Sequence, residues 1–204
     1  MARAADSTIK EALEPDGLPS QQRARRDRII QAALDLLKEG EYEEIQIKDV
    51  ADRAGVALAT LYRYFTSKEH LYAAVLLEWS RTAETRQRAG VEQLDTDAER
   101  IRFLLIGVVK AVGRRPQVLR AEMVLATTRD PNARVLFDQF AERHNEVMTA
   151  ALRDVSADKA AAIVEVTSSV LGTQLQSWAR GRCTIKDVER SINRTVDLVL
   201  PDEG

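Results

Sequence analysis

The stretch GVALATLYRYF, from Gly55 to Phe65, places hydrogen-bonding side chains directly after a run of small ones. Thr60 can donate or accept a hydrogen bond, and the neighbouring alanine and leucine side chains can contact a thymine methyl group. Tyr62 and Arg63 can reach base edges or phosphates from the same helix. These side chains at this spacing suit a short helix that lies in the major groove of duplex DNA.

Two further residues are suited to contact the DNA backbone. Lys68 lies where the next helix is expected to begin, so its charge adds to the free backbone N–H groups and the helix dipole that favour a phosphate there. Tyr64 can also reach a phosphate. We therefore expect Tyr64 and Lys68 to contribute mainly to affinity, whereas Thr60 and Arg63 set the preference for sequence.

Helical periodicity on both sides of this stretch predicts the elements that position it. Gly55 separates a short helix over residues 48–54 from the helix that follows, at a position where a positive φ costs little. A longer helix over residues 20–39 comes before them, and Gly40 ends it. Short helices joined by a tight glycine turn are typical of a helix-turn-helix unit.

The rest of the chain also has the pattern of helices. Three sequences have the form of a capping box: TSKE at residues 66–69, TDAE at 96–99 and TIKD at 184–187. Pro116 and Pro131 each fit the first turn of a helix. We count nine helices and no convincing strand, which predicts an all-α fold.

One segment resembles the N-terminal domain of the tetracycline-repressor (TetR) family of bacterial transcriptional regulators: YEEIQIKDVADRAGVALATLYRYFTSKEHLYAAV. The resemblance extends over roughly Arg23 to Trp79. It implies a helix-turn-helix DNA-binding domain over 20–66 and a helical ligand-binding and dimerisation domain over 67–204. Residues 1–19 lack an apolar repeat, and we expect them to form a flexible arm.

The same resemblance implies a set of DNA contacts and shows two departures from the family. Gln46 stands where the family usually has threonine, and Ala57 stands where serine or threonine usually begins the third helix. Because alanine cannot cap a helix, we expect that helix to lack a cap contributing about 1 kcal/mol. The expected DNA contacts are Arg25, Gln46, Ala57, Leu58, Ala59, Thr60, Tyr62, Arg63, Tyr64 and Lys68.

Two other segments, TLYRYFTSKEHL and SWARGRCTIKDVERSINRTVDLVL, resemble the KstR-like branch of the family, whose members respond to CoA thioesters of sterol degradation products. This resemblance implies a hydrophobic small-molecule effector, and a CoA thioester in particular. The residues expected to bind it are Phe103, Leu119, Met123, Phe137, Phe140 and His144. The same spacing also fits plain core packing. Arg114 and Arg115 could receive a CoA phosphate, or could simply be solvated.

The last two helices carry more apolar surface than one core needs. Small residues between the two apolar stripes of the eighth helix permit close helix approach, so we expect a second copy of the chain to cover the surplus. The expected dimer contacts are Val164, Ser168, Leu171, Gly172, Leu175, Trp178, Val188, Ile192 and Val196. Two copies would read a near-palindromic operator.

Composition limits the other classes of function. The chain has 204 residues, a net charge of −2, a single cysteine and only two histidines. We find no metal-ligand cluster, no glycine-rich phosphate loop and no nucleophile motif, so we expect neither an enzyme nor a cofactor. No apolar run is long enough to span a membrane, which favours the cytoplasm. The alternatives left open are a transcriptional activator and a helical interaction module without DNA binding.

Overall fold

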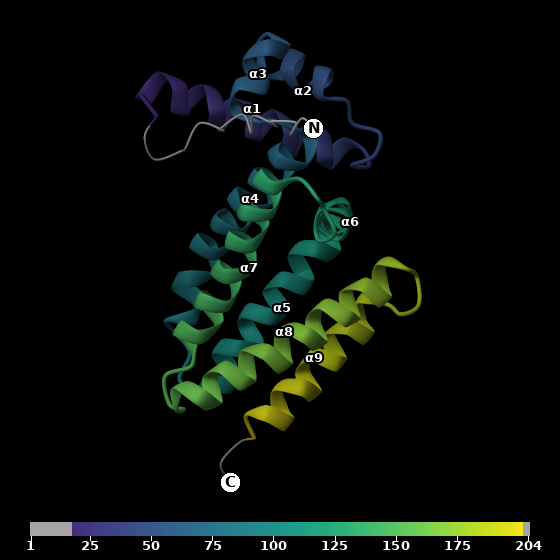
Figure 1. Cartoon of the computed structure of the whole chain (residues 1–204). Helices are drawn as coiled ribbons and strands as arrows, with labels where there is room; N and C mark the ends of the chain where they lie inside the picture. Colours follow the sequence, from purple (N-terminus) through teal and green to yellow (C-terminus); the bar gives the residue numbers. More distant parts are fainter. Residues whose placement is uncertain (1–17, 202–204) are drawn as a thin grey trace, which may run out of the picture.

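The structure, a computed structural model, describes residues 18–201 apart from the side chain of Arg86. This part of the chain forms nine helices and no strand (Figure 1), which confirms the expected all-α class. The helices are α1 (Ser20–Glu39), α2 (Ile47–Ala54), α3 (Leu58–Tyr64), α4 (Lys68–Val91), α5 (Asp97–Arg114), α6 (Pro116–Leu125), α7 (Pro131–Ala151), α8 (Ala157–Ala179) and α9 (Ile185–Val199). Most of the expected arm, residues 1–17, lies outside the described residues. Within 18–201, no helix is both long and apolar enough to cross a membrane.

The first three helices pack together at one end of the molecule (Figure 1). Ile29 of α1, Val50 of α2 and Leu61 of α3 are fully buried in their common core. The apolar residues that recur at helical spacing on α1 and α2 point into this core, as the periodicity predicts. The three helices therefore form one unit that holds α3 by its inner face.

The turn between α2 and α3 depends on Gly55. This glycine has a φ of 65°, in the left-handed region that a residue without a Cβ adopts at little cost. Its backbone N–H donates to the Asp52 carbonyl at 3.2 Å, and the Val56 N–H donates to the Ala51 carbonyl at 3.0 Å. These bonds close the end of α2 and fix the direction in which α3 leaves it.

The start of α4 differs from the predicted capping box over residues 66–69. Ser67 is the capping residue, and its Oγ accepts a hydrogen bond from the His70 N–H at 2.9 Å. The Thr66 hydroxyl instead accepts a hydrogen bond from Nδ2 of Asn132, on α7, at 2.9 Å. The prediction was wrong by one residue, since Thr66 instead joins the α3–α4 connection to α7.

The other predicted helix starts are confirmed. The boxes at 96–99 and 184–187 both form, with each threonine accepting from the third backbone N–H of its helix. Pro116 and Pro131 each occupy the first turn of a helix. The short capping motifs therefore located most of these ends correctly.

Two hydrophobic cores lie along the molecule, and α6 contributes to both. Val118, Ala121 and Leu125 are buried in the first core together with α1–α3 and the first half of α4. Leu119, from the same helix, is buried in the second core, which α5, α7, α8 and α9 complete. Trp79 of α4 packs against both. The first unit is thus anchored to the rest of the chain by α4 and α6.

A buried arginine ties the far end of the second core together. Arg100 of α5 is buried, and its guanidinium donates to the carbonyls of Asp95 at 2.9 Å and Ala151 at 2.8 Å. It also pairs with the carboxylates of Asp97 and Asp154. A charge this far from solvent is tolerated only when its donors are satisfied, so this arginine fixes the α4–α5 and α7–α8 connections against each other.

Candidate nucleic-acid interface and effector cavity

The α3 helix presents one face to solvent and buries the other. Leu58 and Tyr62 are each 40% exposed, and Arg63 is exposed beside them. Leu61 and, at the end of the helix, Phe65 are fully buried in the first core. The outward face therefore carries residue types that read base edges, on a helix held in place by its inner face.

The N-terminal end of α3 is lined by small side chains. Ala57 and Ala59 are exposed, and Thr60 is half-buried. Ala57 occupies the N-cap position and no side chain caps the helix, as an alanine at this position predicts. Small side chains at this end allow the backbone to approach a DNA groove closely.

The two residues expected to contact phosphates lie in different surroundings. Tyr64 is only 4% exposed and belongs to the first core, so its assignment to the DNA surface is corrected. Lys68 is half-buried, with its Nζ 4.4 Å from the centre of the Tyr42 ring and 3.3 Å from the Glu43 carbonyl, to which it donates. Burial lowers the pKa of Lys68. The ammonium group of Lys68 has two further N–H donors, so a phosphate can bind it beside the contact to Glu43.

Arg25 and Gln46 complete the expected set. Arg25 is half-buried on α1, and Gln46 is exposed at the N-cap position of α2 without capping that helix. The Gln46 side chain is therefore available for an outside partner. Both residues stay in the candidate interface.

An apolar cavity of about 310 Å³ lies among α4, α5, α6, α7 and α8. Three of the expected ligand-binding residues line it: Phe137, Phe140 and His144. Trp79, Leu104, Val108, Val147 and Met148 are among the other lining residues. The volume is in the range of natural small-molecule pockets, and the walls suit a hydrocarbon group.

The other three expected ligand contacts do not line this cavity. Leu119 is buried in the second core, and Met123 packs against that core from a half-buried position. Phe103 is 40% exposed on the outer side of α5, in a separate surface hollow with Arg102 and Lys110. Helical spacing predicted that these residues are apolar and inward-facing as a group, but it did not separate the cavity wall from solid core or from the outer face of α5.

Three of the polar residues in the cavity wall, Glu122, His144 and Ser168, have polar groups that are shielded from solvent. Burial raises the pKa of the Glu122 carboxyl to about 7, and it lowers the pKa of His144, which the nearby Glu84 carboxylate opposes. The Ser168 hydroxyl is buried and has no hydrogen-bond partner within residues 18–201. Such unpaired groups in an apolar cavity are available to hydrogen-bond a ligand.

Most of the lining residues were not predicted as ligand contacts from the sequence, Trp79 and Glu122 among them, and four others were assigned to the dimer interface: Ser168, Leu171, Gly172 and Leu175. Glu122 gave one usable signal, because a lone carboxylate stands between apolar Ala121 and Met123 in a helix that is otherwise largely buried. Trp79 gave none, since an aromatic residue in a long amphipathic helix is usually core.

Most of the expected dimer residues are buried within their own chain. Six of them are buried in the second core of their own chain: Val164, Leu171, Leu175, Val188, Ile192 and Val196. Ser168 and Gly172 line the cavity, and Trp178 packs against the second core. For the six buried residues the assignment is corrected, because the chain uses them for its own core, whereas Ser168, Gly172 and Trp178 are half-buried and stay expected contacts. The outer stripe of α8 carries Val166, which is 45% exposed, with Ser169 and Thr173 also exposed.

Comparison with known proteins identifies the family of the chain. Residues 29–75 match the bacterial regulatory proteins of the tetR family, and residues 95–199 match a tetracyclin repressor-like C-terminal domain. The chain is 32% identical to the HTH-type transcriptional repressor KstR of Rhodococcus jostii, over 98% of this chain and 95% of that protein. It is also 32% identical to KstR of Mycobacterium tuberculosis, over 89% of this chain and 83% of that protein.

Solved structures agree with this relationship. A TetR transcriptional regulator from Rhodococcus sp. RHA1 superimposes with a TM-score of 0.77 at 26% identity, over 91% of this chain and 100% of that one. FadR from Bacillus subtilis, solved in complex with stearoyl-CoA, has the same fold, with a TM-score of 0.67 at 15% identity over 86% and 97% of the two chains. The expectation of a regulator rather than an enzyme is confirmed by these relatives. The chain therefore belongs to the tetR family of bacterial regulatory proteins and is a helix-turn-helix transcriptional repressor.

Proposed function

We propose that the protein acts in the cytoplasm as a dimer that binds a near-palindromic operator and releases it when a CoA thioester with a large apolar group enters the cavity. The observation that carries the proposal is the apolar cavity of about 310 Å³ lined by helices α4 to α8. Residues 20–66 would form the DNA-binding unit, and residues 67–204 the sensing and dimerisation unit.

The DNA surface would be the outer face of α3. Leu58, Tyr62 and Arg63 are exposed on it, and Thr60 lies at its more sheltered edge. Two such helices about 34–36 Å apart can read two half-sites on one face of the duplex. Gln46 and Arg25, on the neighbouring helices, would contact the flanking backbone.

The dimer surface would be the outer stripe of α8 together with α9. Val166 and Leu198 are exposed apolar residues on these helices, and the latter is 81% exposed. Ser169 and Thr173 have short side chains, which allow a second α8 to approach closely. A symmetric pairing of α8 and α9 from two copies would bury this surface in a four-helix interface.

The effector class follows from the cavity and the relatives. Phe137, Phe140 and Met148 make the wall suited to a hydrocarbon group. The fold neighbour FadR binds stearoyl-CoA in its solved structure. An acyl chain in the cavity would favour a dimer in which the α3 helices are wrongly spaced for the operator, and a coupling typical of such systems would lower DNA affinity about fivefold to 150-fold.

The test uses the purified chain and DNA from the region upstream of its own gene. Fluorescence anisotropy at fixed salt measures operator affinity in the presence of stearoyl-CoA, a steroid-acyl CoA and free CoA. We expect at least one of the two thioesters to release the DNA, and free CoA to leave it bound. An operator that stays bound at saturating concentrations of both thioesters would refute the effector class, and a protein that binds no DNA at low salt would refute the proposal as a whole.

A further inference from the structure

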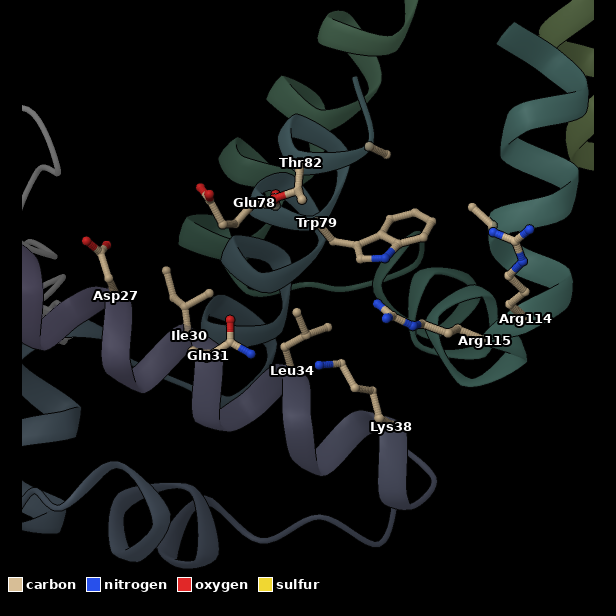
Figure 2. Close-up of a pocket in the computed structure, with 12 residues that line it drawn as sticks. Asp27, Ile30, Gln31, Leu34, Lys38, Glu78, Trp79, Thr82, Arg114 and Arg115 are labelled. Carbon is tan, nitrogen blue, oxygen red and sulfur yellow. The ribbon is translucent and has the colours of Figure 1, made fainter. Parts of the chain in front are cut away.

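A second hollow lies beside the cavity, between the DNA-binding unit and the sensing unit. Its volume is about 690 Å³. One wall is the side of α1 from Asp27 to Lys38, and the others are the middle of α4 and the junction of α5 with α6 (Figure 2). Its lining is far more polar than that of the cavity, with charged residues from three helices. We call this hollow the interdomain groove.

The interdomain groove and the apolar cavity meet at three residues. Trp79, Ala83 and Ala111 line both hollows. Two of the three are alanines, whose side chains take up little space at the junction. The two hollows therefore adjoin, and a ligand with one apolar and one polar part that occupied both would pass beside these alanines.

Positive charge gathers at one end of the groove. Arg114 and Arg115 line it from the α5–α6 junction, and neither forms an ion pair within the described part of the chain, whereas Lys38 is paired with Asp35 at 2.6 Å. Figure 2 shows Lys38 and Arg115 on opposite walls, with the Trp79 indole projecting between the helices. The two unpaired guanidinium groups are free to bind phosphate oxygens, for which their forked geometry is well suited.

The acidic residues of the groove lie at its other end. Asp27 is eleven residues before Lys38 on α1, which separates the two by roughly 16 Å along the helix. Glu78, the other carboxylate, lies on the same side as Asp27 in Figure 2 and has Arg81 at 3.8 Å. An anion at the arginine end would therefore not face these carboxylates directly.

We propose that the arginine end of the interdomain groove binds the phosphorylated nucleotide head of the effector while its acyl part lies in the cavity. This inference rests on the proposed function, because it assumes a CoA thioester as effector. Arg114 and Arg115 would bind the phosphates, and the Trp79 indole offers an aromatic surface against which the adenine or the pantetheine arm can pack. The head would contact α1 on one side and the α5–α6 junction on the other.

This placement gives the head group a part in regulation. Since α1 belongs to the DNA-binding unit and Arg114 and Arg115 to the sensing unit, a head group between them sets the separation of the two units. A thioester without the nucleotide would fill the cavity but leave the groove unoccupied. The nucleotide should therefore strengthen both effector binding and operator release.

The test compares two thioesters of the same acyl group, one of CoA and one of N-acetylcysteamine, which lacks all phosphates. Isothermal titration calorimetry measures their affinities for the full chain and for a double variant, Arg114→Gln with Arg115→Gln. The matched control is Arg180→Gln with Arg182→Gln, two arginines that are also without ion pairs in residues 18–201 but lie outside the groove. Thermal unfolding confirms that each variant is folded.

We expect the groove variant to bind the CoA thioester at least about tenfold more weakly and the N-acetylcysteamine thioester unchanged, while the control binds both as the parent does. Equal binding of the CoA thioester by parent and groove variant would overturn the inference but leave the proposed function intact. So would an equal loss for both thioesters, since that result means a damaged cavity. If the parent protein binds neither thioester, the proposed effector class fails and the inference fails with it.

Discussion

Arg120 of α6 and Glu41 of the α1–α2 connection form an ion pair with two hydrogen bonds, from Nε to Oε2 and from Nη2 to Oε1, each 2.6 Å long. The hydrogen bonds from Arg120 lower the pKa of Glu41. Two residues further along α6, Glu122 lines the cavity. One short helix thus contacts both the effector site and the DNA-binding unit.

We predict that Arg120→Met reduces the effect of effector on DNA affinity strongly but lowers the stability of the fold only slightly. Both partners are partly exposed, so the free energy of unfolding should fall by no more than about 1 kcal/mol. Anisotropy measures operator affinity without and with effector. The ratio of the two affinities should move toward one, because the variant lacks the ion pair that joins α6 to Glu41. Arg102→Met is the control, since its ion pair with Asp197 joins α5 to α9 within the sensing unit. An unchanged ratio in Arg120→Met would show that this pair does not carry the signal.

Glu122 should make stability depend on pH. Burial raises its pKa from 4.5 to about 7 in the folded chain, so unfolding releases a proton between these pH values and stability falls as pH rises through them. Glu122→Gln removes this effect. The variant should match the parent near pH 4 and exceed it at pH 8 by up to about 3 kcal/mol, measured by urea unfolding. The control is Glu142→Gln, at an exposed position on α7, which should leave the free energy of unfolding unchanged relative to the parent. The prediction is contradicted if Glu122→Gln also leaves the free energy of unfolding unchanged at pH 8.

Substitutions on the proposed DNA surface should have two kinds of effect, a change in sequence preference or a uniform loss of DNA affinity. Arg63→Ala and Thr60→Ala should alter the preference among operators that carry single base-pair changes, by about tenfold at the affected positions. Lys68→Ala should weaken binding to all of them alike and reduce the salt dependence by about one counterion. Tyr64→Phe should leave DNA affinity within about twofold, because the ring is buried. A large loss in Tyr64→Phe, or none in Arg63→Ala, would refute this orientation of α3.

The proposed dimer surface on α8 and α9 can be tested by introducing a single charged side chain. Val166→Glu should place a carboxylate in the proposed contact between two α8 helices, and sedimentation velocity should show a monomer in place of a dimer. Val135→Glu is the control, since this valine is 57% exposed on α7. The prediction fails if Val166→Glu remains a dimer, or if both variants dissociate equally.

Sequence reasoning located the helices and the family but not the orientation of every face. Tyr62 and Tyr64 are two residues apart, which turns one side chain about 200° from the other around α3, and the buried one cannot be told from the exposed one by residue type. The two stripes of α8 are similarly apolar, so only the packing of α9 shows that Leu171 belongs inside and Val166 outside. Cavity walls such as Trp79 depend on where five helices leave space, which periodicity within one helix does not describe.

The shared use of α6 by two cores limits how the protein can be divided. Val118, Ala121 and Leu125 fill the base of the helix-turn-helix unit from a helix that lies more than fifty residues further along the chain. A fragment that ends at residue 66 would leave that base open to water and would also lack the buried first half of α4. The DNA-binding unit therefore cannot be transferred alone to another sensing domain. A chimaera that contains it must also carry α4 and a matching α6 surface.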